Sequence, residues 1–61
     1  MMLGLRRGAK QEDIEKLARH IEANGADVQY INGDQVMLGL SGDTSNIDPD
    51  ALSRFEEVER I

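Results

Sequence analysis

The chain has 61 residues, of which 39% are hydrophobic and 31% are charged, a composition that fits a small globular domain with one core. Twelve acidic residues outnumber seven basic ones and give a net charge of −5. A chain with so few basic residues lacks the positive surface that follows a phosphate backbone, so we expect no nucleic acid partner.

The first third of the sequence predicts a strand followed by a helix. Residues 2–6 alternate as in a strand, so residues of opposite parity face opposite sides. Residues 10–24 carry apolar side chains at i, i+3, i+4 and i+7, the spacing of a helix with one buried stripe. The residues of this stripe are Ile14, Leu17, Ala18 and Ile21. Asn24-Gly25 ends the helix, because glycine tolerates the left-handed conformation of a helix end.

The middle of the sequence predicts a β-hairpin. Residues 26–31 and 35–41 have the alternation and composition of strands. Asn32-Gly33 lies between them, and this dipeptide is typical of a type I′ turn, in which both central residues need positive φ. We therefore expect a tight turn at these two residues.

The last part predicts a short helix and a final strand. Asp48 is suited to cap the helix, with Pro49 at its first position and Leu52 and Phe55 on its buried side. The last strand closes at Ile61. The complete order, βαββαβ, predicts an α+β ferredoxin-like sandwich with a four-stranded antiparallel sheet and two helices on one face.

No repeat or linker divides the chain, so we expect residues 1–61 to form a single domain. No apolar run is long enough to cross a membrane, and no basic-then-apolar leader is evident. These features predict a cytoplasmic protein without a membrane partner.

Little in the sequence points to catalysis. Cysteine is absent, which excludes disulfides, thiolate ligands and cysteine nucleophiles. The single histidine, His20, has no second ligand at metal spacing, and a surface position is the simpler interpretation. Ser41-Gly42-Asp43 could suggest a nucleophile or a metal loop, but no base lies near Ser41 in sequence and the ligand pattern of a calcium loop is missing. We expect no catalytic residue, no metal and no cofactor.

The sheet face away from the helices is the most distinctive predicted surface. It carries two methionines, two glycines and an isoleucine, which are Met2, Gly4, Ile31, Met37 and Gly39. Small residues let another backbone approach closely, so this face is expected to be buried against another domain and to support a homo-oligomer. The alternative is that scattered surface hydrophobes have no role.

Four stretches carry a resemblance to a known family. They are residues 1–9 with Glu12-Asp13-Ile14, then residues 39–43, 47–52 and 58–61. In this order they resemble the N-terminal domain of one class of 3-deoxy-7-phosphoheptulonate (DAHP) synthases. In that family the segment is a ferredoxin-like, ACT-like regulatory domain ahead of a (β/α)8 catalytic barrel.

The resemblance implies an enzymatic context that the 61 residues do not supply alone. The barrel condenses phosphoenolpyruvate with erythrose 4-phosphate, using a divalent metal, in the first step of the shikimate pathway to the aromatic amino acids. An aromatic amino acid held between regulatory domains of neighbouring subunits can inhibit the enzyme. Because Ile61 falls where the family's domain ends, we expect an excised regulatory domain or a stand-alone relative, and no catalysis by this chain itself.

The implied ligand site lies on the second strand and the segment after the third. Gln29 and Ile31 stand where tyrosine-binding members tend to carry polar side chains, and Ser41, Gly42 and Asp43 offer hydroxyl, backbone and carboxylate partners. Because Ile31 cannot hydrogen-bond to a phenol, we expect weak binding of tyrosine and comparable binding of phenylalanine.

Three functional hypotheses remain. The first is a regulatory domain of a DAHP synthase that acts by domain association and amino acid binding. The alternative is a ligand-free ferredoxin-like module whose open sheet face dimerises. A small enzyme of the acylphosphatase type is third, because Arg6, Arg7 and Asn46 form no recognisable phosphate cradle.

Overall fold

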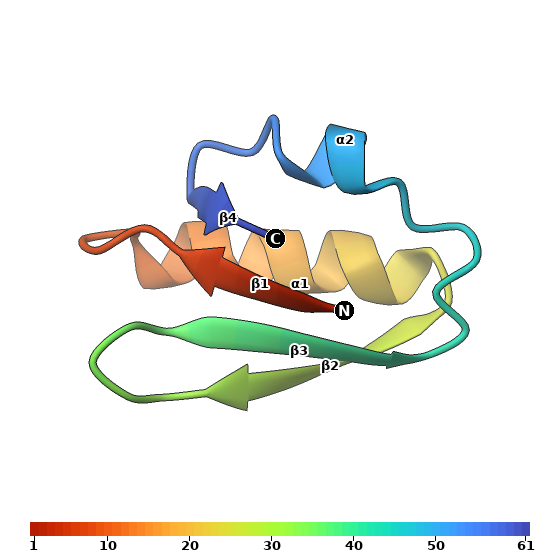
Figure 1. Cartoon of the computed structure of the whole chain (residues 1–61), viewed down its shortest axis with the longest axis horizontal. Coiled ribbons are helices and arrows are strands. Elements are labelled where there is room, and N and C mark those ends of the chain that lie inside the picture. The colour runs from red at the N-terminus through yellow and green to blue at the C-terminus, as the bar shows by residue number, and fades with distance from the viewer.

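Four strands form one sheet in this protein, and a computed structural model describes all residues from 1 to 61. In chain order the elements are β1 (Met2–Leu5), α1 (Gln11–Ala23), β2 (Ala26–Ile31), β3 (Met37–Gly42), α2 (Pro49–Leu52) and β4 (Val58–Arg60). The strands lie side by side in the order β2-β3-β1-β4, and every neighbouring pair is antiparallel (Figure 1). The predicted ferredoxin-like fold is confirmed.

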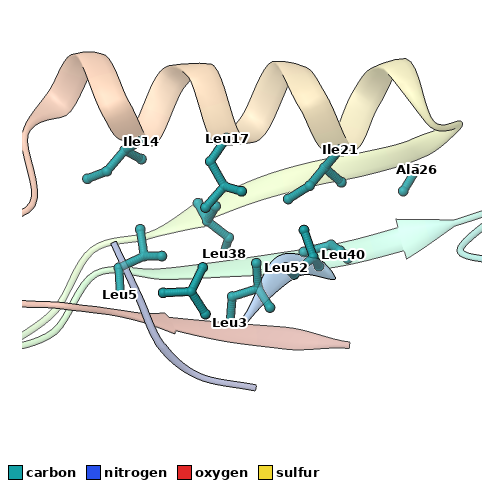
Figure 2. Close-up of a cluster of buried hydrophobic side chains, with 10 residues drawn as sticks. Leu3, Leu5, Ile14, Leu17, Ile21, Ala26, Leu38, Leu40 and Leu52 are labelled. Atoms are coloured by element: carbon teal, nitrogen blue, oxygen red, sulfur yellow. The ribbon is translucent and has the colours of Figure 1, made fainter. Parts of the chain in front are cut away.

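The hydrophobic core lies between α1 and the sheet (Figure 2). The predicted stripe of α1 is buried along its whole length, and its members are Ile14, Leu17, Ala18 and Ile21. Beneath it, Leu3 of β1 and Leu38 of β3 pair with each other and are fully buried. Leu52 of α2 joins the same core. The other face of the sheet therefore has no helix over it.

The ends of the helices follow local rules. Gly25 has a φ of 98°, which confirms its predicted place at the end of α1. Asp48 caps α2, and its Oδ1 accepts a hydrogen bond from the Asp50 backbone N–H at 3.0 Å. Lys10 precedes α1 and makes no side-chain cap, so the first turn of this helix has no such contact.

Several predicted boundaries were wrong by one or two residues. β1 ends at Leu5, α1 spans Gln11–Ala23, and Ile61 lies outside β4. Phe55 lies beyond α2, not within it, although its side chain still packs against the core.

The predicted type I′ turn was also wrong. Ile31 pairs with Met37, so five residues connect the strands, and neither Asn32 nor Gly33 has positive φ. The reason is strand parity: paired residues share a face, and a two-residue turn would pair odd-numbered with even-numbered residues. That register would turn Leu38 away from the face that carries Val28, whereas the five-residue loop leaves both on the helix side.

The longest helix, α1, has 13 residues. None of the helices has the length and apolar character that a membrane span requires.

Candidate functional site

The register brings the five predicted interface residues together on the face without helices, here called the outer face. On it, Met2 lies beside Gly39 and Gly4 lies beside Met37. Ile31 completes the row through its pairing with Met37. The neighbours of these five on the same face are Asp27, Gln29, Ser41 and Arg60.

The outer face carries an exposed apolar group among these polar neighbours. Met2 and Ile31 retain 46% and 39% exposure, and Met37 and Gly39 are half-buried. The Cδ1 atom of Ile31 lies 3.7 Å from the position that a Cβ would occupy at Gly39. Because Gly39 has no side chain, Ile31 can lie across β3 and form a low apolar surface with Met2 and Met37.

Gly4 has a different role from the other four. A Cβ there would lie 3.1 Å from Cγ of Arg60 and 3.2 Å from Nε2 of Gln35. These side chains cover Gly4, which is buried. Gly4 therefore provides room for the chain's own side chains and presents no surface to a partner.

Gln35 connects three segments of the fold. Its Nε2 donates hydrogen bonds to the Leu5 carbonyl oxygen at 3.0 Å and to Oε2 of Glu59 at 3.3 Å. The register between β1 and β4 shifts at Gly4 and Leu5, where a regular ladder would continue. The Gln35 side chain thus satisfies a backbone oxygen at this irregular point.

Sequence reasoning missed the roles of Gln35 and Arg60. A glycine inside a strand indicates that another group approaches closely, so Gly4 carried a usable signal. It did not identify the approaching groups, because Gln35 lies in the hairpin loop and Arg60 in the last strand, far from Gly4 in sequence.

The predicted ligand residues are only partly brought together. Gln29 and Ile31 lie on the outer face of β2, and Ser41 lies on the same face of β3 opposite Asp27. Gly42, with a φ of 74°, pairs with Ala26 at the end of the sheet.

Asp43 lies beyond β3, and its carboxylate is already hydrogen-bonded. Oδ1 accepts hydrogen bonds from Oγ of Ser45 at 2.6 Å and from the Ser45 backbone N–H at 3.0 Å. The hydroxyl hydrogen bond, followed by the backbone one, lowers the pKa of Asp43 below its ordinary value of 3.8. The Asp43 carboxylate therefore accepts hydrogen bonds from Ser45 of its own loop.

The surface has two depressions, and neither includes the predicted ligand residues. The larger, about 420 Å³, has Arg6, Arg7 and Lys10 on its wall together with three carboxylate side chains. Those carboxylates belong to Asp13, Glu56 and Glu57. Because residues of both charge signs line it, this depression does not present a uniform anion or cation site.

The smaller depression, about 170 Å³, lies between α1 and α2 and includes His20 and Asn46. The ring of His20 lies 5.3 Å from that of Phe55, centroid to centroid. Asn46 is therefore not in the depression that holds Arg6 and Arg7. No three His, Asp or Glu side chains are grouped to hold a metal ion.

Comparison with known families gives one match. The model of the DAHP synthase ferredoxin-like domain matches residues 1–61, the full length of the chain. A search of curated proteins finds no significant match.

Proposed function

The chain belongs to the family of the DAHP synthase ferredoxin-like domain, and we propose that it is a regulatory domain that acts by binding another domain through the outer face of its sheet. In this proposal, the domain is part of an enzyme whose barrel carries out the aldol-type condensation of a DAHP synthase. The 61 residues contribute control of that activity and no catalytic group.

One observation supports this proposal above the others. The outer face has no helix over it, and it carries exposed Met2 and Ile31 on either side of Gly39. Apolar side chains on a flat surface gain free energy when they leave water, at roughly 25 cal/mol per Å². Because Gly39 has no side chain, Ile31 lies across β3, and the resulting low apolar surface with Met2 and Met37 can be covered by a partner.

Regulation then follows from two arrangements of the domains. In one, the outer face is bound to a partner; in the other, it is open to solvent. A ligand shifts this equilibrium only as far as its affinity differs between the two arrangements. An amino acid held at the contact by Gln29 and Ser41 would favour the bound arrangement and hold the domains over the mouth of the barrel.

Gly39→Lys tests the proposed surface. A Cβ at Gly39 meets only ordinary van der Waals neighbours, so the variant is expected to fold with its ammonium group on the outer face. Gly33→Lys is the matched control, because Gly33 is an exposed loop glycine without positive φ. We expect sedimentation to show an associating parent chain, an associating Gly33→Lys variant and a monomeric Gly39→Lys variant. Equal behaviour of both variants would contradict the proposal.

A ligand-free docking module is the second candidate. It is favoured by the absence of any depression at Gln29, Ile31, Ser41, Gly42 or Asp43 within the single domain. Calorimetry with aromatic amino acids separates the two candidates, because only the first requires heat of binding under conditions in which the domain associates.

A further inference from the structure

The chain contains two Asn-Gly dipeptides in different surroundings. Asn24-Gly25 lies between α1 and β2, and Asn32-Gly33 lies in the loop that joins β2 to β3 at one end of the sheet (Figure 1). Asparagine is a chemically labile residue, and a following glycine has no Cβ to keep the asparagine side chain away from the next backbone nitrogen. The reactivity of each dipeptide therefore depends on whether the fold holds these two groups apart.

Hydrogen bonds hold both reacting groups of the first dipeptide. The Gly25 backbone N–H donates to the Glu22 carbonyl oxygen at 3.0 Å, and Nδ2 of Asn24 donates to the His20 carbonyl oxygen at 2.8 Å. Asn24 has a ψ of 12°, which nearly eclipses the Gly25 nitrogen with the backbone nitrogen of Asn24 and so turns it away from Cβ. A ring closure here must first break both hydrogen bonds and rotate the end of α1.

The second dipeptide has no such restraint. The Gly33 backbone N–H and the Asn32 side chain make no hydrogen bond within the chain. Both residues are exposed. The one atom near the Cβ position of Gly33 is the Gln35 carbonyl oxygen, at 3.9 Å. The Asn32 side chain can therefore reach the Gly33 nitrogen without the loss of any contact.

We propose that Asn32 is a site of spontaneous covalent modification, at which the folded chain converts asparagine to aspartate and isoaspartate while Asn24 stays intact. The Gly33 backbone nitrogen gives its proton to a base in the solvent and attacks Cγ of Asn32. A bond forms between this nitrogen and Cγ, and the side-chain amide nitrogen takes up a proton and leaves as ammonia. Water then opens the resulting succinimide at either of its two carbonyl carbons, which gives aspartate or isoaspartate. Water is the only co-reactant, and nothing is oxidised or reduced.

The modification changes both the charge and the length of the loop. Either product places a second carboxylate in the loop, two positions from Asp34. Isoaspartate also directs the backbone through the side chain and adds a methylene group to the connection between Ile31 and Met37. The same connection carries Gln35, whose amide donates to the Leu5 carbonyl oxygen. The isoaspartate form therefore alters the segment that positions Gln35.

Incubation of the folded 61-residue chain in mildly alkaline buffer tests the proposal. NMR follows the side-chain amide signals of Asn24 and Asn32 separately, and fragment mass spectrometry identifies the modified residue. We expect Asn32 to be lost at least about tenfold faster than Asn24, because the Asn24 site must open locally before it reacts. Gly33→Ala is the matched variant, since Gly33 has no positive φ and a Cβ there fits the loop. It should slow the loss of Asn32 and leave Asn24 unchanged.

The same incubation in denaturant separates the effect of the fold from that of the local sequence. Neither dipeptide is held in the unfolded chain, so the two asparagines should then be lost at comparable rates. Comparable rates in the folded chain, or an Asn32 that stays intact there while it reacts in denaturant, would overturn the proposal. A preference for Asn32 that persists unchanged in denaturant would also overturn it, because the flanking residues alone would then account for the selectivity.

Discussion

Nε2 of Gln35 lies 3.0 Å from the Leu5 carbonyl oxygen, which is thirty positions away in sequence. This contact joins the hairpin loop to β1 at the point where the pairing of β1 with β4 shifts register. A hydrogen bond of this kind satisfies a partly buried backbone oxygen that would otherwise lose its partner.

We expect Gln35→Ala to lower the free energy of unfolding by about 0.5–1.5 kcal/mol, the usual net contribution of one hydrogen bond. Chemical denaturation measures the change. Asp34→Ala is the matched control, since Asp34 is exposed in the same loop and should change stability little. Equal stability of the parent and the Gln35 variant would show that water replaces the amide without cost.

The cap of α2 provides a second prediction. The Asp48 carboxylate accepts the Asp50 backbone N–H, and α2 places Leu52 in the core. Asp48→Ala should reduce stability by about 0.5–2 kcal/mol, whereas Asp48→Asn should retain most of the parental stability because the amide oxygen can accept the same hydrogen bond. Thermal unfolding of the three chains measures this order. Equal losses in both variants would contradict a capping role.

The loop after β3 predicts a pH effect. The hydrogen bonds from Ser45 hold the pKa of Asp43 below 3.8 in the folded chain. The ionised carboxylate thus stabilises the fold at pH values above 3.8, and this contribution is lost as the pH falls through the lowered pKa of the folded state.

We expect Ser45→Ala to raise the pKa of Asp43 toward 3.8, because it removes the hydroxyl donor, the larger of the two causes. Titration of the Asp43 carboxyl carbon by NMR measures the change. Ser53→Ala is the control, since that hydroxyl donates to the Asp50 backbone oxygen and not to Asp43. An unchanged pKa of Asp43 in Ser45→Ala would assign the lowering to the backbone N–H alone.

The fold could be read from the sequence wherever one periodicity dominated. The helical spacing of Ile14, Leu17 and Ile21 and the alternation of the first three strands were sufficient to predict the core and the face of each strand. The hairpin turn was mispredicted because Asn32-Gly33 strongly favours a two-residue turn locally. The observed register instead places Leu38 and Leu40 on the buried face, and this burial outweighs the local turn preference.

The site could be predicted less completely. Alternation alone placed Met2, Ile31, Met37 and Gly39 on one face, and the register agrees. Gly4 is covered by the side chain of Arg60, which lies on β4, a three-residue strand with a shifted register. A strand this short has too few residues for a sequence period to define it. The hydrogen bonds that the Asp43 carboxylate accepts from Ser45 were likewise missed, although Asp-x-Ser is a typical local turn pattern.

Amino acid binding gives a further prediction. If Gln29 and Ser41 hold an amino acid at the domain contact, the aromatic ring lies toward Ile31, which offers no hydrogen bond to a phenol. We therefore expect weak binding, with tyrosine and phenylalanine of comparable affinity, measured by calorimetry at concentrations at which the chain associates. A strong preference for tyrosine would place the site elsewhere, and no heat with either would favour the ligand-free module.

The most direct test of association through the outer face is NMR of methyl groups in a dilution series. Met2, Met37 and Ile31 lie on this face, whereas Ile47 packs against the core on the opposite side of the sheet. We predict that the methyl signals of Met2, Met37 and Ile31 shift with concentration and that the Ile47 signals stay fixed. Methyl signals that do not move up to high micromolar concentration, or that move only at Ile47, would contradict association through the outer face.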